Sequence, residues 1–393
     1  MKKYILISSL AFTMLFATTF SVHGEEKSKS DKNSINLAED AKSAILIERD
    51  TGKKLFDKNA HEKLPPASMT KIMTLLLIME ALDKGDLKKD EMIRISERAS
   101  SMGGSQIFLE AGEEMSVNDL LKGIAVASGN DASVALAERI AGSEEAFVEK
   151  MNNKVKELKL KNTHFQNTTG LPAEDHYSTS HDMAIIAKEL LKYESITEYT
   201  SLYEDYLRKG EENEFWLVNT NKLVKFYPGV DGLKTGFTNE AKYCLTATAK
   251  KHDMRVIAVV MGADKPKERN AAISNMLDYA FNHFETKNLF EKGQTITNLK
   301  DLKAENKNIN IVASQSISTL HKKGESTEDI TTSVVLDDKL SLPMKKGEQA
   351  GKLIVNKGDK VLSETPLVVE KDVQPASYLT LFKRSVRSLT KNR

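Results

Sequence analysis

The chain of 393 residues has one cysteine, almost no net charge and, beyond its N-terminal end, no long apolar run. A single thiol cannot form an internal disulfide, so the fold must be stabilised by hydrophobic cores. Cys244 lies in an apolar run and is expected to be a buried small side chain. The formal net charge of +1 gives no reason to expect nucleic acid as a partner. The histidines show no metal-ligand spacing, so neither a metal nor another cofactor is expected.

The N-terminal end is typical of a secretory signal peptide, residues 1–24. Lys2 and Lys3 precede an uncharged apolar run over residues 4–22, and Val22 and Gly24 occupy the key positions before a cleavage point. Residues 25–37, rich in Lys, Ser, Glu and Asn, predict a disordered lead-in. The alternative is an uncleaved membrane anchor, because the apolar run is almost long enough to span a bilayer.

Periodicity predicts an α/β domain over residues 38–286. A helix from Ala67 to about Lys84, stopped by Gly85, is apolar nearly all round and should be buried. Other helices are expected at 117–127, 132–140, 143–158, 180–192 and 267–284, and strands at 43–48, 54–57, 230–236, 243–249 and 254–262.

The pattern changes at the end of this domain. Short alternating runs separated by Gly, Asn, Asp and Lys predict a small all-β domain over residues 287–370. Its strands are expected at 309–312, 333–335, 340–342, 352–355, 361–362 and 366–369.

Ser68 and Lys71 stand three residues apart at the start of the long predicted helix, so they share one face and can touch. A serine hydroxyl is a poor nucleophile until a base removes its proton, and a lysine in a dry pocket can be partly neutral and act as that base. Free N–H groups at a helix N-terminus also favour negative charge there. Taken alone, the pair could equally be a helix cap beside a solvated lysine.

Two further motifs follow along the chain. Ser128-Gly129-Asn130 could place in a cleft a hydroxyl that passes a proton to a leaving amine and an amide that binds a peptide backbone. Lys234-Thr235-Gly236 ends a predicted strand, where a cation and a hydroxyl could hold a carboxylate and a glycine would let a substrate backbone approach. Each of these motifs, taken alone, could be an ordinary turn.

The three motifs in this order are far more specific than any one of them. S-x-x-K, S-D-N and K-T-G together are the signature of penicillin-binding proteins and class A β-lactamases. With Gly129 in the middle motif, the whole chain resembles the low-molecular-mass D-alanyl-D-alanine carboxypeptidases, in which S-G-N is usual. The resemblance implies a penicillin-binding/β-lactamase-like transpeptidase fold, an antiparallel sheet with a helical cluster, plus a small all-β C-terminal domain. One departure is Ala241-Lys242, where the family often has Ala-Gly.

This resemblance implies that the enzyme removes the terminal D-Ala from peptidoglycan stem pentapeptides through an acyl-enzyme on Ser68, and that β-lactams acylate it. Lys71 is then the base, and Ser128 relays the proton to the leaving amine. Backbone N–H groups of Ser68 and Phe237 form the oxyanion hole, and Arg269 could add positive charge nearby. The substrate-binding residues implied are Asn130, Lys234, Thr235, Gly236 and Phe237.

Two other functions fit the same motifs. A class A β-lactamase uses a glutamate to activate the deacylating water, whereas the segment from Phe165 to Gly170 contains no carboxylate. A catalytically silent wall-peptide-binding protein could share the fold, but all key motif positions are intact. Covalent labelling by a fluorescent penicillin would separate a silent binder from an enzyme.

The tail, residues 371–393, predicts an amphipathic helix that lies on the outer face of the cytoplasmic membrane. It is too short and too charged to span a bilayer. The alternative is a helix docked on the protein's own surface. Its apolar side is expected to comprise Tyr378, Leu379, Leu381, Phe382, Val386 and Leu389, and its basic side Lys383, Arg384, Arg387 and Lys391.

Overall fold

The computed structural model describes residues 35–338 and 340–391, and of residues 385–391 only the backbone. The predicted signal peptide and most of the predicted lead-in lie outside the described residues. Among the helices in the described ranges, none is long and apolar enough to cross a membrane.

A five-stranded antiparallel sheet is the centre of the first domain, with strand order β2-β1-β9-β8-β7. The N-terminal hairpin pairs with the last hairpin of the domain, so β1 lies between β2 and β9, and β7 is an edge strand. All five predicted strands are confirmed: β1 Ser43–Glu48, β2 Lys54–Lys58, β7 Val230–Thr238, β8 Lys242–Lys251 and β9 Met254–Ala263.

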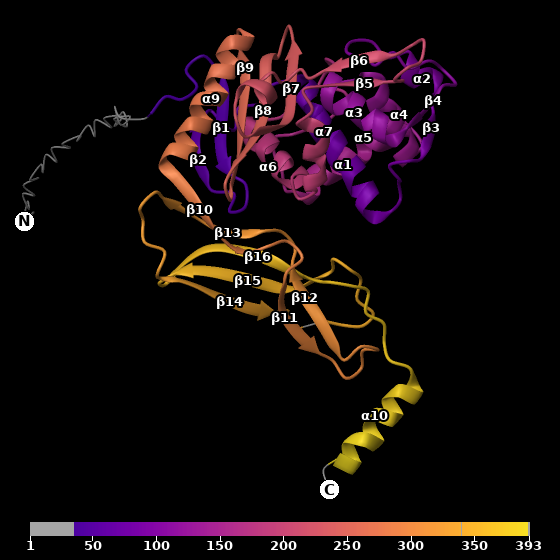
Figure 1. Cartoon of the computed structure of the whole chain (residues 1–393), viewed down its shortest axis with the longest axis vertical. Coiled ribbons are helices and arrows are strands. Elements are labelled where there is room, and N and C mark those ends of the chain that lie inside the picture. Colours follow the sequence, from indigo (N-terminus) through magenta and orange to yellow (C-terminus); the bar gives the residue numbers. More distant parts are fainter. Residues whose placement is uncertain (1–34, 339, 392–393) are drawn as a thin grey trace, which may run out of the picture. The chain divides into compact units, whose positions relative to one another are not determined.

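Alternate residues of β1 enter two hydrophobic cores on opposite faces of this sheet. Ile45 and Ile47 join the core of the helical cluster, whereas Ala44 and Leu46 join the core that α9 covers. Figure 1 shows α9 on one side of the sheet and the helical cluster on the other. The predicted helices are confirmed as α1 Lys71–Lys84, α3 Val117–Ala127, α4 Asn130–Ala141, α5 Glu144–Glu157, α6 Ser180–Leu190 and α9 Pro266–His283.

The first turn of the long predicted helix is a separate 3-10 helix, η1 Ala67–Thr70, which leads directly into α1. Helix α1 is buried on nearly all sides, as its composition predicts, and ends at Gly85 in the left-handed conformation. Periodicity does not predict the short elements η2 Glu194–Ile196, α2 Glu97–Ser100, α7 Thr197–Thr200, α8 Leu223–Phe226, β3 Met92–Arg94, β4 Glu114–Ser116, β5 Glu204–Leu207 and β6 Phe215–Val218.

The C-terminal domain is all-β, as predicted, with its own hydrophobic core. One sheet has the order β11-β12-β16-β15-β14, and β10 pairs with β13. Strand β10 follows α9 without a linker and spans the predicted boundary at residue 286. The bounds are β10 Phe284–Phe290, β11 Thr295–Lys300, β12 Asn308–Ala313, β13 Ile317–Lys322, β14 Ile330–Leu336, β15 Gln349–Lys357 and β16 Lys360–Val369.

Two strand predictions in this domain are corrected. Residues 340–342 form no strand, and Leu340 and Leu342 instead pack against the core from an irregular segment. Pro343 follows them, and a proline provides no N–H for a sheet. The runs predicted at 361–362 and 366–369 belong to one continuous strand, β16. The tail forms a helix, α10 Tyr378–Lys391.

Candidate active site

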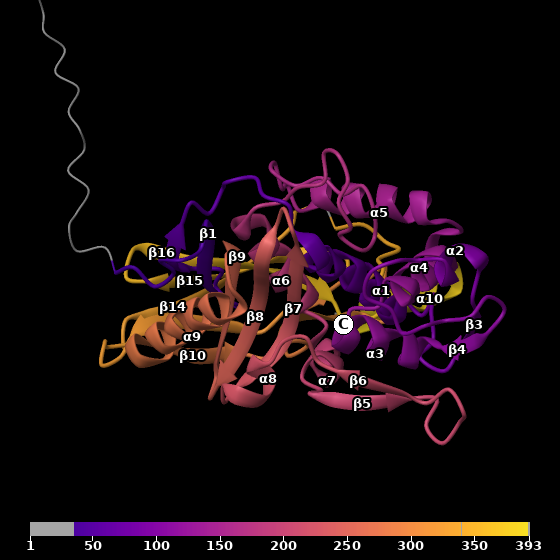
Figure 2. The same ribbon diagram turned by 90° about the horizontal axis from the view of Figure 1, so that it is seen from above.

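The three motifs come from η1 and α1, from the corner between α3 and α4, and from β7. Figure 2 shows β7 at the edge of the sheet nearest to α1 and α3. A Cβ atom on Gly236 of β7 would lie 2.7 Å from the carbonyl oxygen of Pro66 and 3.2 Å from the nitrogen of Met69. Only glycine allows β7 to pack this closely on η1, so this contact brings the third motif beside Ser68.

Lys71 lies at the centre of the site and is fully buried. Its Nζ donates hydrogen bonds to Ser68 Oγ at 3.2 Å, to Asn130 Oδ1 at 2.6 Å and to the carbonyl oxygen of Thr169 at 2.8 Å. Burial, and secondly the charge of Lys234, hold the pKa of Lys71 well below its usual value, while Asp131 opposes them. A lysine with a lowered pKa in contact with a serine hydroxyl can accept its proton.

Ser128 ends helix α3 in the left-handed conformation, with φ of 66°. This turn directs the next residues into α4, so Asn130 stands at the first position of that helix. The Ser128 Oγ atom is buried and has no hydrogen-bond partner among the described residues. A buried hydroxyl without a partner is costly. It lines the same cavity as Ser68, where a bound substrate could provide the missing partner.

Lys234 is a second buried lysine, 1% exposed. Its Nζ donates to the carbonyl oxygen of Thr235 at 3.2 Å. Burial, and secondly the charge of Arg269, lower the pKa of Lys234 to about 7. The hydroxyl of Thr235 donates to Thr220 Oγ1 at 2.7 Å. Two cations and two hydroxyls therefore lie together where a carboxylate could be bound.

A cavity of about 410 Å³ joins the motifs. Five of the eight predicted site residues line it, and the other three, Lys71, Asn130 and Lys234, lie behind this lining. Arg269, from α9, also lines it. The lining residues that sequence patterns do not single out are Ser105, Thr220, Lys222, Tyr243, Pro266 and Asn270.

The segment before α6 closes the site from behind Lys71. Thr74 Oγ1 donates to the carbonyl oxygen of Thr168 at 2.7 Å, one residue before the carbonyl that Lys71 contacts. His176 contacts Thr70 Oγ1 through Nε2 at 2.8 Å, and its Nδ1 accepts from the backbone N–H of Gln166 at 3.1 Å. Burial lowers the pKa of His176 to about 4, so it is neutral and donates through Nε2. These contacts fix the carbonyl that faces Lys71.

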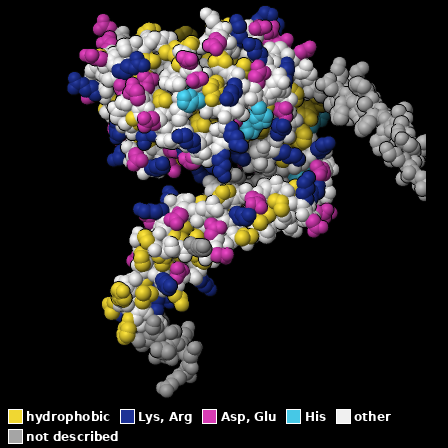
Figure 3. Space-filling model, turned by 180° about the vertical axis from the view of Figure 1, so that it is seen from behind, with side chains coloured by type: hydrophobic (Ala, Val, Ile, Leu, Met, Phe, Trp, Pro, Cys, Tyr) yellow, Lys and Arg dark blue, Asp and Glu magenta, His cyan; other side chains and the backbone are white. Residues whose placement is uncertain are grey.

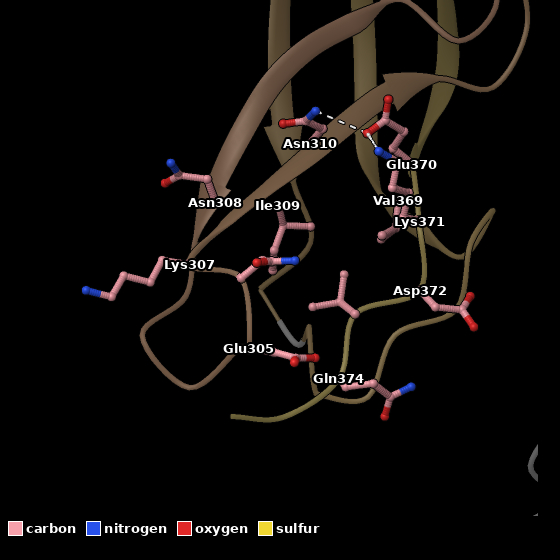
Figure 4. Close-up of a pocket in the computed structure, with 12 residues that line it drawn as sticks. Glu305, Lys307, Asn308, Ile309, Asn310, Val369, Glu370, Lys371, Asp372 and Gln374 are labelled. Carbon is pink, nitrogen blue, oxygen red and sulfur yellow. Dashed lines mark hydrogen bonds and ion pairs between the residues drawn. The ribbon is translucent and has the colours of Figure 1, made fainter. Parts of the chain in front are cut away.

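A cavity in the β domain differs in chemistry from the one that joins the motifs (Figure 4). It has a volume of about 340 Å³ and lies between the start of β12 and the segment after β16. Amides, carboxylates and lysines line it, and Asn310 Nδ2 donates to Glu370 Oε2 at 3.1 Å. Its described lining includes no serine, threonine or cysteine, so it offers no hydroxyl or thiol nucleophile.

Comparisons with known proteins agree on one family. A family model described as D-alanyl-D-alanine carboxypeptidase matches residues 27–265, and one described as penicillin-binding protein 5, C-terminal domain, matches residues 284–375. The D-alanyl-D-alanine carboxypeptidase DacF of Bacillus subtilis (strain 168) is 59% identical over 360 residues, which is 92% of this chain and 92% of that protein.

Solved structures show the same relationship. Penicillin-binding protein 5 from Haemophilus influenzae is 32% identical with a TM-score of 0.65, and the match covers 85% of this chain and 98% of that chain. Penicillin-binding protein D2 from Listeria monocytogenes, in its ampicillin-bound form, is 30% identical with a TM-score of 0.57, and the match covers 63% of this chain and 100% of that chain.

The fold and the three motifs thus define a protein of the penicillin-binding class, with the α/β and all-β domains that the sequence predicts. The chain belongs to the D-alanyl-D-alanine carboxypeptidase family and is a carboxypeptidase of that specificity.

Proposed function

We propose that Ser68 is the nucleophile with which this carboxypeptidase removes the terminal D-Ala of peptidoglycan stem pentapeptides. Neutral Lys71 takes the proton of Ser68 Oγ, which attacks the carbonyl carbon of the penultimate D-Ala. The backbone N–H groups of Ser68 and Phe237 stabilise the oxyanion. Collapse breaks the peptide bond, Ser128 passes a proton to the departing nitrogen, and D-Ala leaves. Water then hydrolyses the ester and regenerates the Ser68 hydroxyl.

The observation that carries this proposal is the contact of 3.2 Å between Nζ of the fully buried Lys71 and Oγ of the half-buried Ser68. Burial of Lys71 and, secondly, the charge of Lys234 favour the neutral amine. Ser128 supports the relay role because its hydroxyl lines the same cavity and has no hydrogen-bond partner in the part of the chain that the structure describes. Asn130 is proposed to bind the acyl amide of the substrate.

The substrate carboxylate is proposed to lie against Lys234, Thr235 and Arg269. A charged Lys234 with an adjacent guanidinium and hydroxyl gives charge-assisted hydrogen bonds to a carboxylate. Gly236 lets the peptide backbone lie along the edge of β7. A β-lactam carries a carboxylate and an acyl amide in a similar arrangement, so we expect β-lactams to acylate Ser68. The ampicillin-bound Listeria relative supports this expectation.

The decisive experiment is labelling with a fluorescent penicillin, followed by mass analysis of the labelled peptide. Wild-type protein should carry the adduct on Ser68, and Ser68→Ala should remain folded but unlabelled. In parallel, a peptide ending in D-Ala-D-Ala should lose one residue only with the wild type. An adduct on another residue of Ser68→Ala would refute the assignment.

We further propose export through the N-terminal segment, with residues 38–286 as the catalytic domain and residues 287–370 as a spacer. The tail, residues 371–393, then lies on the outer face of the cytoplasmic membrane. Tyr378, Leu379 and Phe382 are 93%, 63% and 69% exposed, and Leu302 of the β domain is 67% exposed. Figure 3 shows hydrophobic side chains gathered at this end of the molecule. Such exposed apolar groups are typical of a membrane-binding surface.

A further inference from the structure

The middle motif carries no carboxylate, but the next residue along the chain provides one. Asp131 is 1% exposed. Its carboxylate accepts hydrogen bonds from the backbone N–H groups of Ile107 at 3.0 Å, Leu109 at 3.2 Å and Ala132 at 2.9 Å. A buried carboxylate is stable only with such donors, so the segment before β4 and the start of α4 are fixed to each other.

The space next to Gly129, and not its backbone conformation, requires a glycine at this position. Its φ of −55° and ψ of 119° are open to any residue. A Cβ atom at this position would lie 2.9 Å from Asp131 Oδ1, which is closer than real Cβ atoms approach. The Asp131 carboxylate therefore occupies the space into which a side chain at position 129 would point. An aspartate at 129 would bring its own carboxylate to the same place.

The segment that Asp131 fixes also orients Asn130. The Asn130 side chain donates through Nδ2 to the carbonyl oxygen of Gly103 at 2.6 Å, and its backbone N–H donates to that of Ser105 at 2.7 Å. With Nδ2 held by Gly103, Oδ1 is turned toward Lys71 Nζ, 2.6 Å away. Ser105 itself lines the catalytic cavity. A displacement of this segment would therefore move both the amide and the wall of the cavity.

A second anchor holds the same segment from the other side. Arg208, at the end of β5, donates to the carbonyl oxygens of Ile107 at 3.2 Å and Phe108 at 3.3 Å, and pairs with Glu113. The N–H groups of the segment are thus held by Asp131 and its carbonyls by Arg208. Because the peptide groups are held from both directions, loss of the carboxylate shifts the segment without releasing it.

We infer that Asp131 is a positioning residue whose carboxylate replaces the one that S-D-N motifs carry at the middle position. It acts through the 103–109 segment on Asn130 and Lys71, and it touches neither the substrate nor the reacting atoms. The inference rests on the proposed roles of Ser68, Lys71 and Asn130. It predicts that the carboxylate can be moved from position 131 to position 129 with retention of activity.

The test compares four variants by the rate of penicillin acylation. Asp131→Ala should acylate at least about tenfold more slowly, because small displacements of positioning groups have large effects on rate. Gly129→Asp should also be impaired, because two carboxylates would compete for one space. The double variant Gly129→Asp/Asp131→Ala should recover most of the rate. Its matched control, Gly129→Ala/Asp131→Ala, adds a Cβ atom without a carboxylate and should stay slow.

The pH profile provides a readout that loss of packing alone would not change. Lys71 faces Lys234 from β7 and Asp131 from α4, and the Asp131 charge raises the pKa of Lys71. Asp131→Asn should therefore lower the pKa of Lys71 and move the acid limb of acylation to lower pH. The double variant Gly129→Asp/Asp131→Ala should return the acid limb to its wild-type pH. Glu48→Gln is a control, because Glu48 is a buried carboxylate that accepts backbone N–H groups at the β1–β2 turn. It should lower stability without moving the pH profile.

The outcomes separate this inference from the proposed function. If wild-type protein is labelled on Ser68 but the two double variants, both folded by circular dichroism, acylate equally slowly, then Asp131 has no transferable positioning role. If Ser68→Ala is still labelled, the proposed function itself fails. Equal pH profiles for wild type and Asp131→Asn would likewise overturn the inference.

Discussion

Two buried lysines with opposite requirements share the proposed site. Lys71 must be neutral to accept a proton, whereas Lys234 must be charged to hold a carboxylate. Their charges repel, which is one reason why the pKa of Lys71 lies well below its usual value. The pKa of Lys234 is lowered to about 7, chiefly by burial, and this value then sets the highest pH at which the free enzyme binds the substrate carboxylate well. One lysine thus controls the acid side of activity and the other the alkaline side.

This pair predicts a bell-shaped dependence of kcat/KM on pH. Below the pKa of Lys71 the amine is protonated and activity falls, and above about pH 7 free Lys234 loses its charge and activity falls again. A bound carboxylate favours charged Lys234, so the alkaline limb of kcat should lie at higher pH than that of kcat/KM. Steady-state kinetics on a D-Ala-D-Ala peptide measure both. Rates that stay flat from mildly acid to mildly alkaline pH would refute the proposed base.

Substitution by arginine distinguishes the two lysines. Lys71→Arg should lower the acylation rate by about 10²–10⁴-fold, because a guanidinium does not deprotonate and general base catalysis is lost. Lys234→Arg retains the charge, so it should keep measurable activity while the alkaline limb disappears. Penicillin acylation rates measured across pH check both. If the two variants lose acylation rate to a similar extent and neither changes its pH limbs, then Lys71 is not the base and Lys234 not the carboxylate-binding cation.

A stability prediction comes from the departure at Ala241-Lys242. Lys242 adopts a φ of 57° directly after the β7–β8 turn, where Thr238 pairs with it. Glycine adopts this left-handed conformation without the steric clash that a Cβ atom causes. Lys242→Gly should raise the free energy of unfolding by roughly 0.5–1 kcal/mol, because relief of left-handed strain exceeds the added entropy of the unfolded chain.

Urea denaturation measures this change through the midpoint of the transition. Lys250→Gly is the matched control, since Lys250 lies within strand β8 and pairs with Arg255. That substitution should lower stability, because glycine weakens a strand. If both variants lose stability, left-handed strain at position 242 is not significant.

Several residues of the site have no sequence signature. The motifs predicted Ser68, Lys71 and the other members because the three motifs in this order form a family signature. Thr169 acts through its backbone carbonyl, which any residue could provide. Thr220 reaches Thr235 only because the segment before α8 returns to β7, a consequence of tertiary packing. Such contacts follow from the fold and not from local patterns.

At the scale of elements, the sequence predicted long periodic helices and strands well. Helix α3 has the predicted bounds, and β7, β8 and β9 extend the predicted strands by a few residues. Short elements such as β5 and β6 were not predictable, because four residues carry too little periodicity. In the β domain, an apolar run before Pro343 resembled a strand although it packs as an irregular segment.

We expect the β domain to be dispensable for acylation. All described residues that line the cavity of the proposed site lie between Ser68 and Asn270. The Listeria relative is covered completely by 63% of this chain. A chain ending at His283, the last residue of α9, should therefore acylate with penicillin at a rate within about twofold of wild type.

This truncation should nevertheless lower stability. Leu320 of β13 belongs to the core that α9 covers, and Ser318 Oγ donates to Asp50 Oδ2 at 2.8 Å. Thermal unfolding and penicillin labelling of the same preparation separate the two effects. A shortened chain that is soluble and folded but does not acylate would show that the β domain builds part of the site.

At the scale of the whole molecule, the proposal separates catalysis in the first domain from membrane binding by the tail. The tail helix α10 contacts the β domain through Arg384. Its guanidinium donates to the carbonyl oxygens of Leu302, Ala304 and Glu305 at 2.7, 2.6 and 2.7 Å. One residue of the predicted basic side is thus bonded to the β domain, while Tyr378 and Phe382 stay exposed. Leu302, whose carbonyl oxygen accepts one of these hydrogen bonds, has an exposed side chain as well.

The proposed membrane binding through α10 can be tested by truncation and substitution. A chain ending at Pro375 should be released from anionic vesicles and keep full activity on a soluble peptide, because α10 provides the apolar and basic groups. Phe382→Ser should weaken binding at all salt concentrations, whereas Lys383→Glu should weaken it mainly at low salt, where electrostatic attraction is least screened. Sedimentation with vesicles measures each. If the chain ending at Pro375 binds as well as the full chain, α10 is not the anchor, and an uncleaved N-terminal segment becomes the better candidate.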